Sequence, residues 1–264
     1  NMSMNYSIIL GNLGNTCDRF LSSGYKEDLD KDTMLKQASQ INRVKGIELV
    51  GTWDIDESNV KEMKQKLDDF GLTCVSVIPD LFSRKKWGNG SFSSANSDIR
   101  REAVSEVNKC TDMAVEMNCD LLNIWPGQDG YDYALCADYM EERQWFAEGI
   151  RESARYAAKK GVRFALEYKL KEPRTHSYLA RAADTILLIK ELDMENVGAC
   201  IDTGHAFAAY ENVGESISLF KMAGDKLFHM HYNDNYSAWD DDMIVGSLRL
   251  TEFFEILFWL KKTN

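Results

Sequence analysis

A glutamate and a lysine two residues apart, Glu167 and Lys169, follow an apolar run that begins at Phe164. Side chains alternate between the two faces of a β-strand, so both charged groups point to one side if this run is a strand. Such a pair is either an ordinary ion pair or a metal ligand beside a group that donates a hydrogen bond to substrate. This segment alone leaves both interpretations open, and the rest of the chain favours the second.

Asp202, His205 and His231 follow the next two strand-like runs of the chain. The carboxyl ends of parallel strands meet at one end of a barrel, so Glu167, Asp202 and His231 would point into one bowl. Two carboxylates and an imidazole form a ligand set for a divalent cation of the Mn²⁺, Mg²⁺, Co²⁺ or Zn²⁺ kind. Three of the four histidines lie at these strand ends, which favours a site over chance.

A pair of aspartates, Asp240 and Asp242, lies in the loop after the last of these runs. These two carboxylates would close a second cation site in which Asp202 bridges both ions. Trp53 and Trp125 also fall at predicted strand ends, where their rings suit the apolar faces of a sugar.

Each of these residues also has a less specific interpretation. The alternatives are a structural ion pair for Glu167 and Lys169, turn formation for Asp202, a hydrogen-bonded core histidine for His229, a solvated loop at 240–242, and ordinary core packing for Trp53, Trp125 and Trp239.

Strand-like and helix-like runs alternate along the chain. Strands are predicted at 6–10, 46–50, 72–78, 121–125, 162–168, 197–201 and 226–230, and helices at 33–43, 59–70, 99–117, 140–160, 178–192, 215–223 and 251–262. This pattern predicts an α/β fold, a (β/α)₈ TIM barrel formed by residues 1–264 as one domain. Only seven units are present, so we expect a barrel that is incomplete at its C-terminus, in a truncated chain or one that naturally continues. An open doubly wound sheet is less favoured because no Gly-rich loop follows the first strand.

The composition limits the classes of partner. The 264 residues are 44% hydrophobic and carry a net charge of −11, which disfavours nucleic-acid binding through a general electrostatic surface. The six cysteines show no C-x-x-C spacing, and no long uncharged apolar run occurs, so we expect reduced thiols, no membrane contact and a cytoplasmic location. Asn1 ahead of Met2 indicates a residue left from an expression tag.

Four segments carry a resemblance to a known family. Residues 167–173 read E-Y-K-L-K-E-P, similar to the E-P-K-P-x-E-P run of xylose isomerases, and residues 125–132 read W-P-G-Q-D-G-Y-D, similar to their W-G-G-R-E-G-Y-D loop. Residues 202–205 read D-T-G-H and residues 239–242 read W-D-D-D, similar to the bridging acid with its histidine and to the W-D-x-D loop. The chain thus resembles the xylose-isomerase-like TIM-barrel superfamily of sugar isomerases and epimerases.

The resemblance implies roles for these residues. Glu167, Asp202 and His231 would bind the first metal, and Asp202, His205, Asp240 and Asp242 the second. Lys169, Glu167 and His205 would be catalytic, and Trp53, Trp125, Lys169 and His205 would contact substrate. His231 stands where xylose isomerases carry an Asp, and where rhamnose isomerases and ketose 3-epimerases carry a His.

Two departures from the family pattern also follow from the sequence. Trp53 and Asp54 replace the strand-2 H-x-x-D pair, which puts ring opening by a histidine in doubt. The strand-8 acid, the fourth ligand of the first metal, is absent, so we expect the metal site of this chain to be incomplete.

The sequence therefore predicts a metal-dependent isomerase of carbohydrate metabolism that interconverts an aldose and a ketose. An unphosphorylated sugar is the expected substrate, Mn²⁺ the expected cation, and a homo-oligomer the expected assembly. An epimerase of the same superfamily is the alternative. An apurinic-site endonuclease is less favoured, because histidines are few and the net charge is negative. A sugar-binding protein without activity is the remaining, less favoured alternative.

Overall fold

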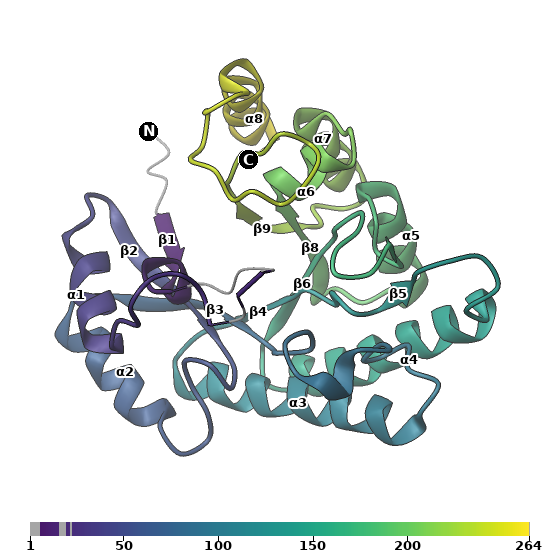
Figure 1. The fold of residues 1–264 in the computed structure, drawn as a ribbon, viewed down its shortest axis with the longest axis horizontal. Helices are drawn as coiled ribbons and strands as arrows, with labels where there is room; N and C mark the ends of the chain where they lie inside the picture. The colour runs from purple at the N-terminus through teal and green to yellow at the C-terminus, as the bar shows by residue number, and fades with distance from the viewer. Residues whose placement is uncertain (1–5, 16–19, 22, 264) are drawn as a thin grey trace.

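Seven parallel strands form the main sheet of the computed structural model, which describes residues 6–15, 20–21 and 23–263. They are β1 (Tyr6–Ile9), β2 (Val44–Val50), β3 (Thr73–Ile78), β4 (Leu121–Ile124), β6 (Arg163–Glu167), β8 (Val197–Asp202) and β9 (Leu227–His231), and they are hydrogen-bonded in that order. The sheet curls around an open interior with the helices outside it (Figure 1). An incomplete TIM barrel, as the sequence predicts, is therefore confirmed.

The described residues contain eight α-helices and two short 3-10 helices. They are α1 (Lys31–Gln40), α2 (Val60–Asp69), α3 (Ser97–Glu116), α4 (Tyr139–Ala158), α5 (Ala182–Leu192), α6 (Thr203–Ala208), α7 (Val213–Met222), α8 (Leu250–Thr263), η1 (Leu10–Leu13) and η2 (Lys85–Trp87). Side chains cap several of them: Asp30 accepts from the backbone of Thr33, and Asp138 from that of Glu141. The sequence predicts these two helices from residues 33 and 140, and they begin one or two residues earlier, at Lys31 and Tyr139.

The central strands are buried on both faces. Every residue of β4 and β8 is buried, because helices cover the outer face and side chains fill the barrel interior. Polar exceptions occur at the carboxyl ends, where Glu167 and Asp202 are buried, and within β2, where Glu48 is buried. A buried charge is costly unless it is paired, so these positions point to a site.

The sheet is open between its first and last strands. Among the described residues, β1 pairs only with β2 and β9 pairs only with β8. A cavity of about 920 Å³ lies between β1 and β9, lined among others by Ile8, Glu48, Asp202 and His231. This opening corresponds to the position of the eighth unit of a closed barrel.

Some elements differ from the sequence prediction. The helix expected from residue 178 begins at Ala182, because Tyr178 donates its backbone N–H to Asp129 in a connecting segment instead. The predictions omitted α6 directly after β8 and the small antiparallel pair β5 (Gly130–Tyr131) and β7 (His176–Ser177). Two-residue strands and a six-residue helix are too short for their periodicity to be read from a sequence.

Two further expectations concern the cysteines and membranes. Five cysteines, at positions 74, 110, 119, 136 and 200, are free thiols in the structure. Cys17 and Asn1 lie outside the described residues. Across residues 6–15, 20–21 and 23–263, no helix has the length and apolar character that a membrane crossing requires.

Candidate active site

Glu167 stands at the carboxyl end of β6, inside the barrel. Its side chain is buried, and the amide of Asn123, on the neighbouring strand β4, donates a hydrogen bond to Oε2. Burial raises the pKa of the Glu167 carboxyl, but His231 and His205 outweigh this effect and lower that pKa to about 2. Glu167 is therefore a buried, ionised carboxylate.

Asp202 ends β8 and begins α6. Its Oδ1 accepts a hydrogen bond from the backbone N–H of His205 at 2.9 Å, so Asp202 is the N-cap of this helix. This bond fixes the backbone position of His205. The Asn233 amide donates to both Asp202 oxygens, at 3.0 and 2.8 Å. Burial raises the pKa of Asp202, and the charge of Glu167 adds to that rise. Turn formation, the less specific interpretation of Asp202, is thus a real part of its role.

His205 lies between three acceptors. Its Nδ1 is 3.0 Å from the backbone oxygen of Tyr168 and 3.3 Å from Glu167 Oε1, and its Nε2 is 3.0 Å from Asp240 Oδ2. Burial lowers the pKa of His205, but Asp202, Asp240 and Glu167 outweigh it and raise that pKa to about 9. Ligand atoms of Glu167, Asp202 and His205 all lie within 4.8 Å of one another.

Lys169 pairs with the aspartate loop. Its Nζ lies 2.7 Å from Asp240 Oδ2 and 3.4 Å from Glu172 Oε2, and it sits 5.2 Å from the centre of the Trp125 ring. Among the described residues the ion-pair partners of Lys169 are therefore Asp240 and Glu172, not Glu167. Burial lowers the pKa of Lys169, but Asp240 outweighs it and keeps that pKa above its usual value.

Asp240 is the point where Lys169 and His205 meet. Burial raises its pKa, but the contacts with His205 and Lys169 outweigh this, so the pKa lies well below its usual value. Its other oxygen, Oδ1, is buried and has no hydrogen-bond partner in the described residues. Asp242 lies nearby, and part of the residue is exposed to solvent. Desolvation of its carboxyl by the surrounding protein atoms, together with the charges of Asp240 and Asp202, raises its pKa to about 6.

His231 ends β9 and lies between two carboxylates. Its Nδ1 is 3.3 Å from Glu167 Oε2, and its Nε2 is 3.1 Å from Glu48 Oε2. Burial lowers the pKa of His231, but Glu167, Glu48 and the adjacent Cys200 outweigh it and raise that pKa well above its usual value. Glu167, Cys200 and His231 form a second group whose ligand atoms lie within 4.8 Å.

The predicted triad of Glu167, Asp202 and His231 is therefore divided. Asp202 and His231 are partners in the register of β8 and β9. In the described residues, however, the ligand atoms that lie within 4.8 Å of one another form two groups: Glu167 with Asp202 and His205, and Glu167 with Cys200 and His231. The His231 ring bridges Glu167 and Glu48, with Nδ1 at 3.3 Å from Glu167 and Nε2 at 3.1 Å from Glu48.

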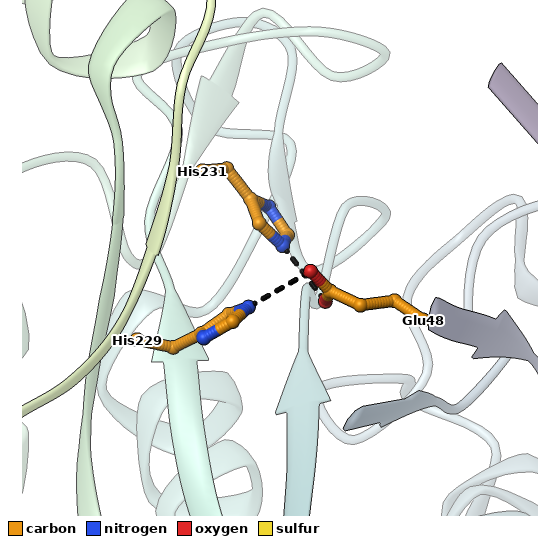
Figure 2. A group of neighbouring side chains, drawn as sticks. All are labelled: Glu48, His229 and His231. Carbon is orange, nitrogen blue, oxygen red and sulfur yellow. Dashed lines mark hydrogen bonds and ion pairs between the residues drawn. The ribbon is translucent and has the colours of Figure 1, made fainter. Parts of the chain in front are cut away.

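Glu48 is the site residue that the sequence reasoning missed. It lies within the buried strand β2 and binds both His229 and His231, whose rings approach its carboxylate from β9 (Figure 2). His229 is hydrogen-bonded, as its less specific interpretation predicts. The sequence does contain a signal for Glu48, which is the one charged residue in the apolar run 47–50. A glutamate is rarely fully buried without partners, so its place in a buried strand indicates partners inside the barrel.

Aromatic rings form one wall near Lys169. Phe82 links Trp53 and Trp125: its ring centre lies 5.5 Å from that of Trp53 and 4.8 Å from that of Trp125. Trp53 is 47% exposed, so one of its faces is accessible to a ligand. Asp54, by contrast, accepts a hydrogen bond from the backbone of Val50 and serves the local turn.

The donor set fits a divalent cation. It combines carboxylate oxygens with imidazole nitrogens, which suit Mn²⁺ and similar ions, and it includes a buried oxygen of Asp240 that no described donor satisfies. Four of the six residues predicted as metal ligands, Glu167, Asp202, His205 and Asp240, are joined by direct contacts, and Asp242 lies close enough to respond to the charges of Asp240 and Asp202. His231 touches this set through Glu167.

Comparison with known proteins gives the relatives of this chain. A family model described as "Xylose isomerase-like TIM barrel" matches residues 35–259. A xylose isomerase from Thermus thermophilus is 30% identical over 209 residues, which cover 78% of this chain and 54% of that enzyme, and one from Thermus caldophilus is 28% identical over the same extent. The chain thus spans about half the length of these relatives.

Solved structures show the same fold. A D-tagatose 3-epimerase-like protein aligns with a TM-score of 0.77 and 21% identity, over 98% of this chain and 86% of that one. A D-psicose 3-epimerase crystallised with D-fructose aligns with a TM-score of 0.74 and 16% identity, over 99% and 82%.

Proposed function

Because the chain belongs to the xylose isomerase-like TIM-barrel family, we propose that it carries most of the active site of a metal-dependent sugar isomerase, one that interconverts an aldose and a ketose. The observation that supports this proposal most is the contact network of Lys169, Asp240 and His205. It sets an ammonium group beside a cation-binding loop, which is the arrangement that polarises a carbonyl.

A divalent cation, Mn²⁺ first and Mg²⁺, Co²⁺ or Zn²⁺ as alternatives, supplies Lewis-acid polarisation of neighbouring substrate oxygens when it is bound. Glu167, Asp202 and His231 would hold the first ion. The second would be held by Asp202, His205, Asp240 and Asp242. The two sets share Asp202, as a bridging carboxylate requires.

The protein groups have separate tasks in this proposal. Lys169 donates a hydrogen bond to the sugar carbonyl oxygen as negative charge develops there, and Asp240 keeps its ammonium group oriented. Trp53 and Trp125 offer apolar faces to the sugar, and Phe82 between them excludes water from that wall. An unphosphorylated sugar is the favoured substrate, because the acidic groups around Lys169 repel a phosphate.

An epimerase acting on a ketose is the second candidate. The observation that favours it is the loop after β2, whose residues 51–58 contain no histidine and whose Asp54 is engaged by the Val50 backbone. Such a loop lacks a histidine that could open a sugar ring. In this version Glu167 removes a proton from the reacting carbon and a second acid returns one.

The test is turnover in D₂O with Mn²⁺ and a panel of free aldoses and ketoses. Product without deuterium at the reacting carbon supports a hydride shift and hence the isomerase. Deuterium at that carbon favours proton transfer and the epimerase.

Two further proposals concern assembly and location. Light scattering after size exclusion measures the homo-oligomer that we expect. The proposed cytoplasmic location is consistent with the five free thiols.

A further inference from the structure

Glu48 accepts hydrogen bonds from four side chains. Ser7 Oγ, on β1, lies 3.0 Å from Oε1, and Ser76 Oγ, on β3, lies 2.6 Å from Oε2. His229 Nε2 lies 3.0 Å from Oε1 and His231 Nε2 lies 3.1 Å from Oε2. Each oxygen therefore has two donors, and the side chain is only 2% exposed.

An ionised carboxylate only accepts hydrogen bonds, so each imidazole nitrogen that faces it carries a hydrogen. Both rings present Nε2 to Glu48 (Figure 2). His231 Nδ1 faces Glu167 at 3.3 Å, and while the ring is protonated both of its nitrogens carry a hydrogen. When the ring is neutral, the hydrogen bond to Glu48 keeps the remaining hydrogen on Nε2, so Nδ1 is the nitrogen that offers a lone pair. The arrangement is that of a carboxylate behind a metal-ligating histidine.

We propose that Glu48 is a positioning residue of the site: it holds the Nε2–H tautomer and the ring orientation of His231, so that Nδ1 is presented beside Glu167 as a cation ligand. The inference rests on the proposed function for the ligand role of His231. It goes beyond that function in naming the group that selects the nitrogen.

The position of Glu48 explains why such a group is needed. His231 is the last residue of β9, which has a paired strand on one side only among the described residues. Backbone pairing therefore leaves the ring free to turn toward the cavity beside β1. The hydrogen bond from β9 to Glu48 on β2 crosses this opening and supplies the restraint that a paired strand would otherwise give.

Glu48, His229 and His231 also satisfy the distance criterion for a cation site, since their ligand atoms lie within 4.8 Å. The two serine hydroxyls decide against that reading. With four donors in place, no oxygen of Glu48 lacks a partner, and the rings already lie at ordinary hydrogen-bond distances from it. A separate cation at this cluster is therefore an outcome for the experiment to exclude.

The experiment compares wild type with Glu48→Gln, which keeps the shape but removes one acceptor oxygen and adds a donor. NMR of ¹⁵N-histidine protein reports which ring nitrogen carries hydrogen, in the metal-free protein at alkaline pH and in the Mg²⁺-loaded protein. Only four histidines occur, so a His229→Gln spectrum helps to assign His231. Mn²⁺ affinity is measured from the EPR signal of free Mn²⁺.

We expect His231 to carry its hydrogen on Nε2 in wild type and to populate the other tautomer in Glu48→Gln. Mn²⁺ affinity is expected to fall by about 10–100-fold, the usual effect of losing an outer partner of a ligand histidine. Glu48→Asp keeps a carboxylate and is expected to retain the Nε2–H form; it also serves if Glu48→Gln does not fold. Ser7→Ala, which leaves both histidine contacts intact, is the matched control and should keep wild-type Mn²⁺ affinity.

Two results would overturn the inference. The first is an unchanged His231 tautomer in Glu48→Gln, which would make Glu48 purely structural. The second is a Zn²⁺ equivalent that both Glu48→Gln and His229→Gln remove, which would make the cluster a cation site. If wild type binds no Mn²⁺, the proposed function fails, while the tautomer spectra still decide the role of Glu48.

Discussion

Two regions of the site hold their side chains in different ways. Glu167 and Asp202 stand on β6 and β8, each of which is hydrogen-bonded to a strand on both sides. His231 stands on β9, which is paired on one side, and its outer contact is the single carboxylate of Glu48. The strands of the interior ligands are therefore paired on both sides, whereas the strand of the edge ligand is paired on one side and its ring depends more on side-chain contacts.

The contrast between interior and edge indicates where the site tolerates substitution. An interior ligand is a charge buried among paired strands, so its removal affects the cation directly. At the edge, the contact with Glu48 orients the His231 ring. Removal of that contact therefore changes the affinity for the cation without removing a ligand.

The largest effect is expected from the interior carboxylate. Glu167→Gln removes the charge that both His205 and His231 face, and we expect Mn²⁺ affinity to fall by more than about 100-fold, beyond the range for outer partners. The EPR signal of free Mn²⁺ measures this loss. Glu172→Gln is the control, because Glu172 contacts Lys169 and belongs to none of the described ligand groups. If Glu167→Gln bound Mn²⁺ with wild-type affinity, Glu167 would not be a ligand of the cation.

Lys169→Met tests the chemistry rather than the cation. Loss of a hydrogen-bond donor to a developing oxyanion typically lowers kcat by about 10²–10³-fold, and we expect a fall of this size. Mn²⁺ affinity should stay equal or improve, because Asp240 loses a competing positive charge. Lys171→Met, two residues along the same segment, is the control. An unchanged kcat would assign Lys169 to structure alone.

The sequence predicted the interior region far better than the edge. Glu167, Asp202 and His205 follow apolar runs directly, so parallel pairing brings them to one end of the barrel, and their clustering follows from strand order. Glu48 lies within a strand rather than at its end, and its partners on β9 are 181 and 183 residues away. Contacts between such distant side chains depend on the curl of the sheet, which periodicity does not encode.

The loop region shows the same limit. Asp240 was predicted as a cation ligand, but its contacts with both Lys169 and His205 depend on how the segment after β9 folds back. The division of the predicted triad has a similar cause. Register alone pairs Asp202 with His231, whereas the direction of the His231 ring depends on its contacts with Glu48 and Glu167.

The pH dependence of cation binding tests the buried histidine of the interior. The folded pKa of His205 is about 9, so the metal-free protein holds this ring protonated at pH 7. A cation needs the neutral ring, so binding releases protons and the apparent Kd for Mn²⁺ should fall by up to about 10-fold per pH unit between pH 7 and 9.

Stability of the metal-free protein should change in the opposite direction. A raised folded pKa stabilises the protein below the unfolded pKa of about 6.5, and this contribution is lost as the pH rises toward 9. Calorimetry in buffers of different ionisation enthalpy counts the released protons, and urea titrations follow stability. His205→Asn should flatten both slopes, while His176→Gln, on β7 at the stacked Tyr131 ring, should leave them. Binding independent of pH in wild type would contradict the assignment.

The smallest effect contrasts two serines that donate to the same carboxylate. Ser76 lies on β3, is buried between paired strands, and donates to Glu48 at 2.6 Å, whereas Ser7 lies on the edge strand β1 and donates at 3.0 Å. Either alanine variant removes one hydrogen bond, which contributes about 0.5–1.5 kcal/mol to the free energy of unfolding. Because Ser76 shares Oε2 with His231, its loss should also loosen the His231 ring, while Ser7 shares Oε1 with His229. Urea unfolding should therefore show the larger loss for Ser76→Ala, and equal losses would mean that the edge is as firmly held as the interior.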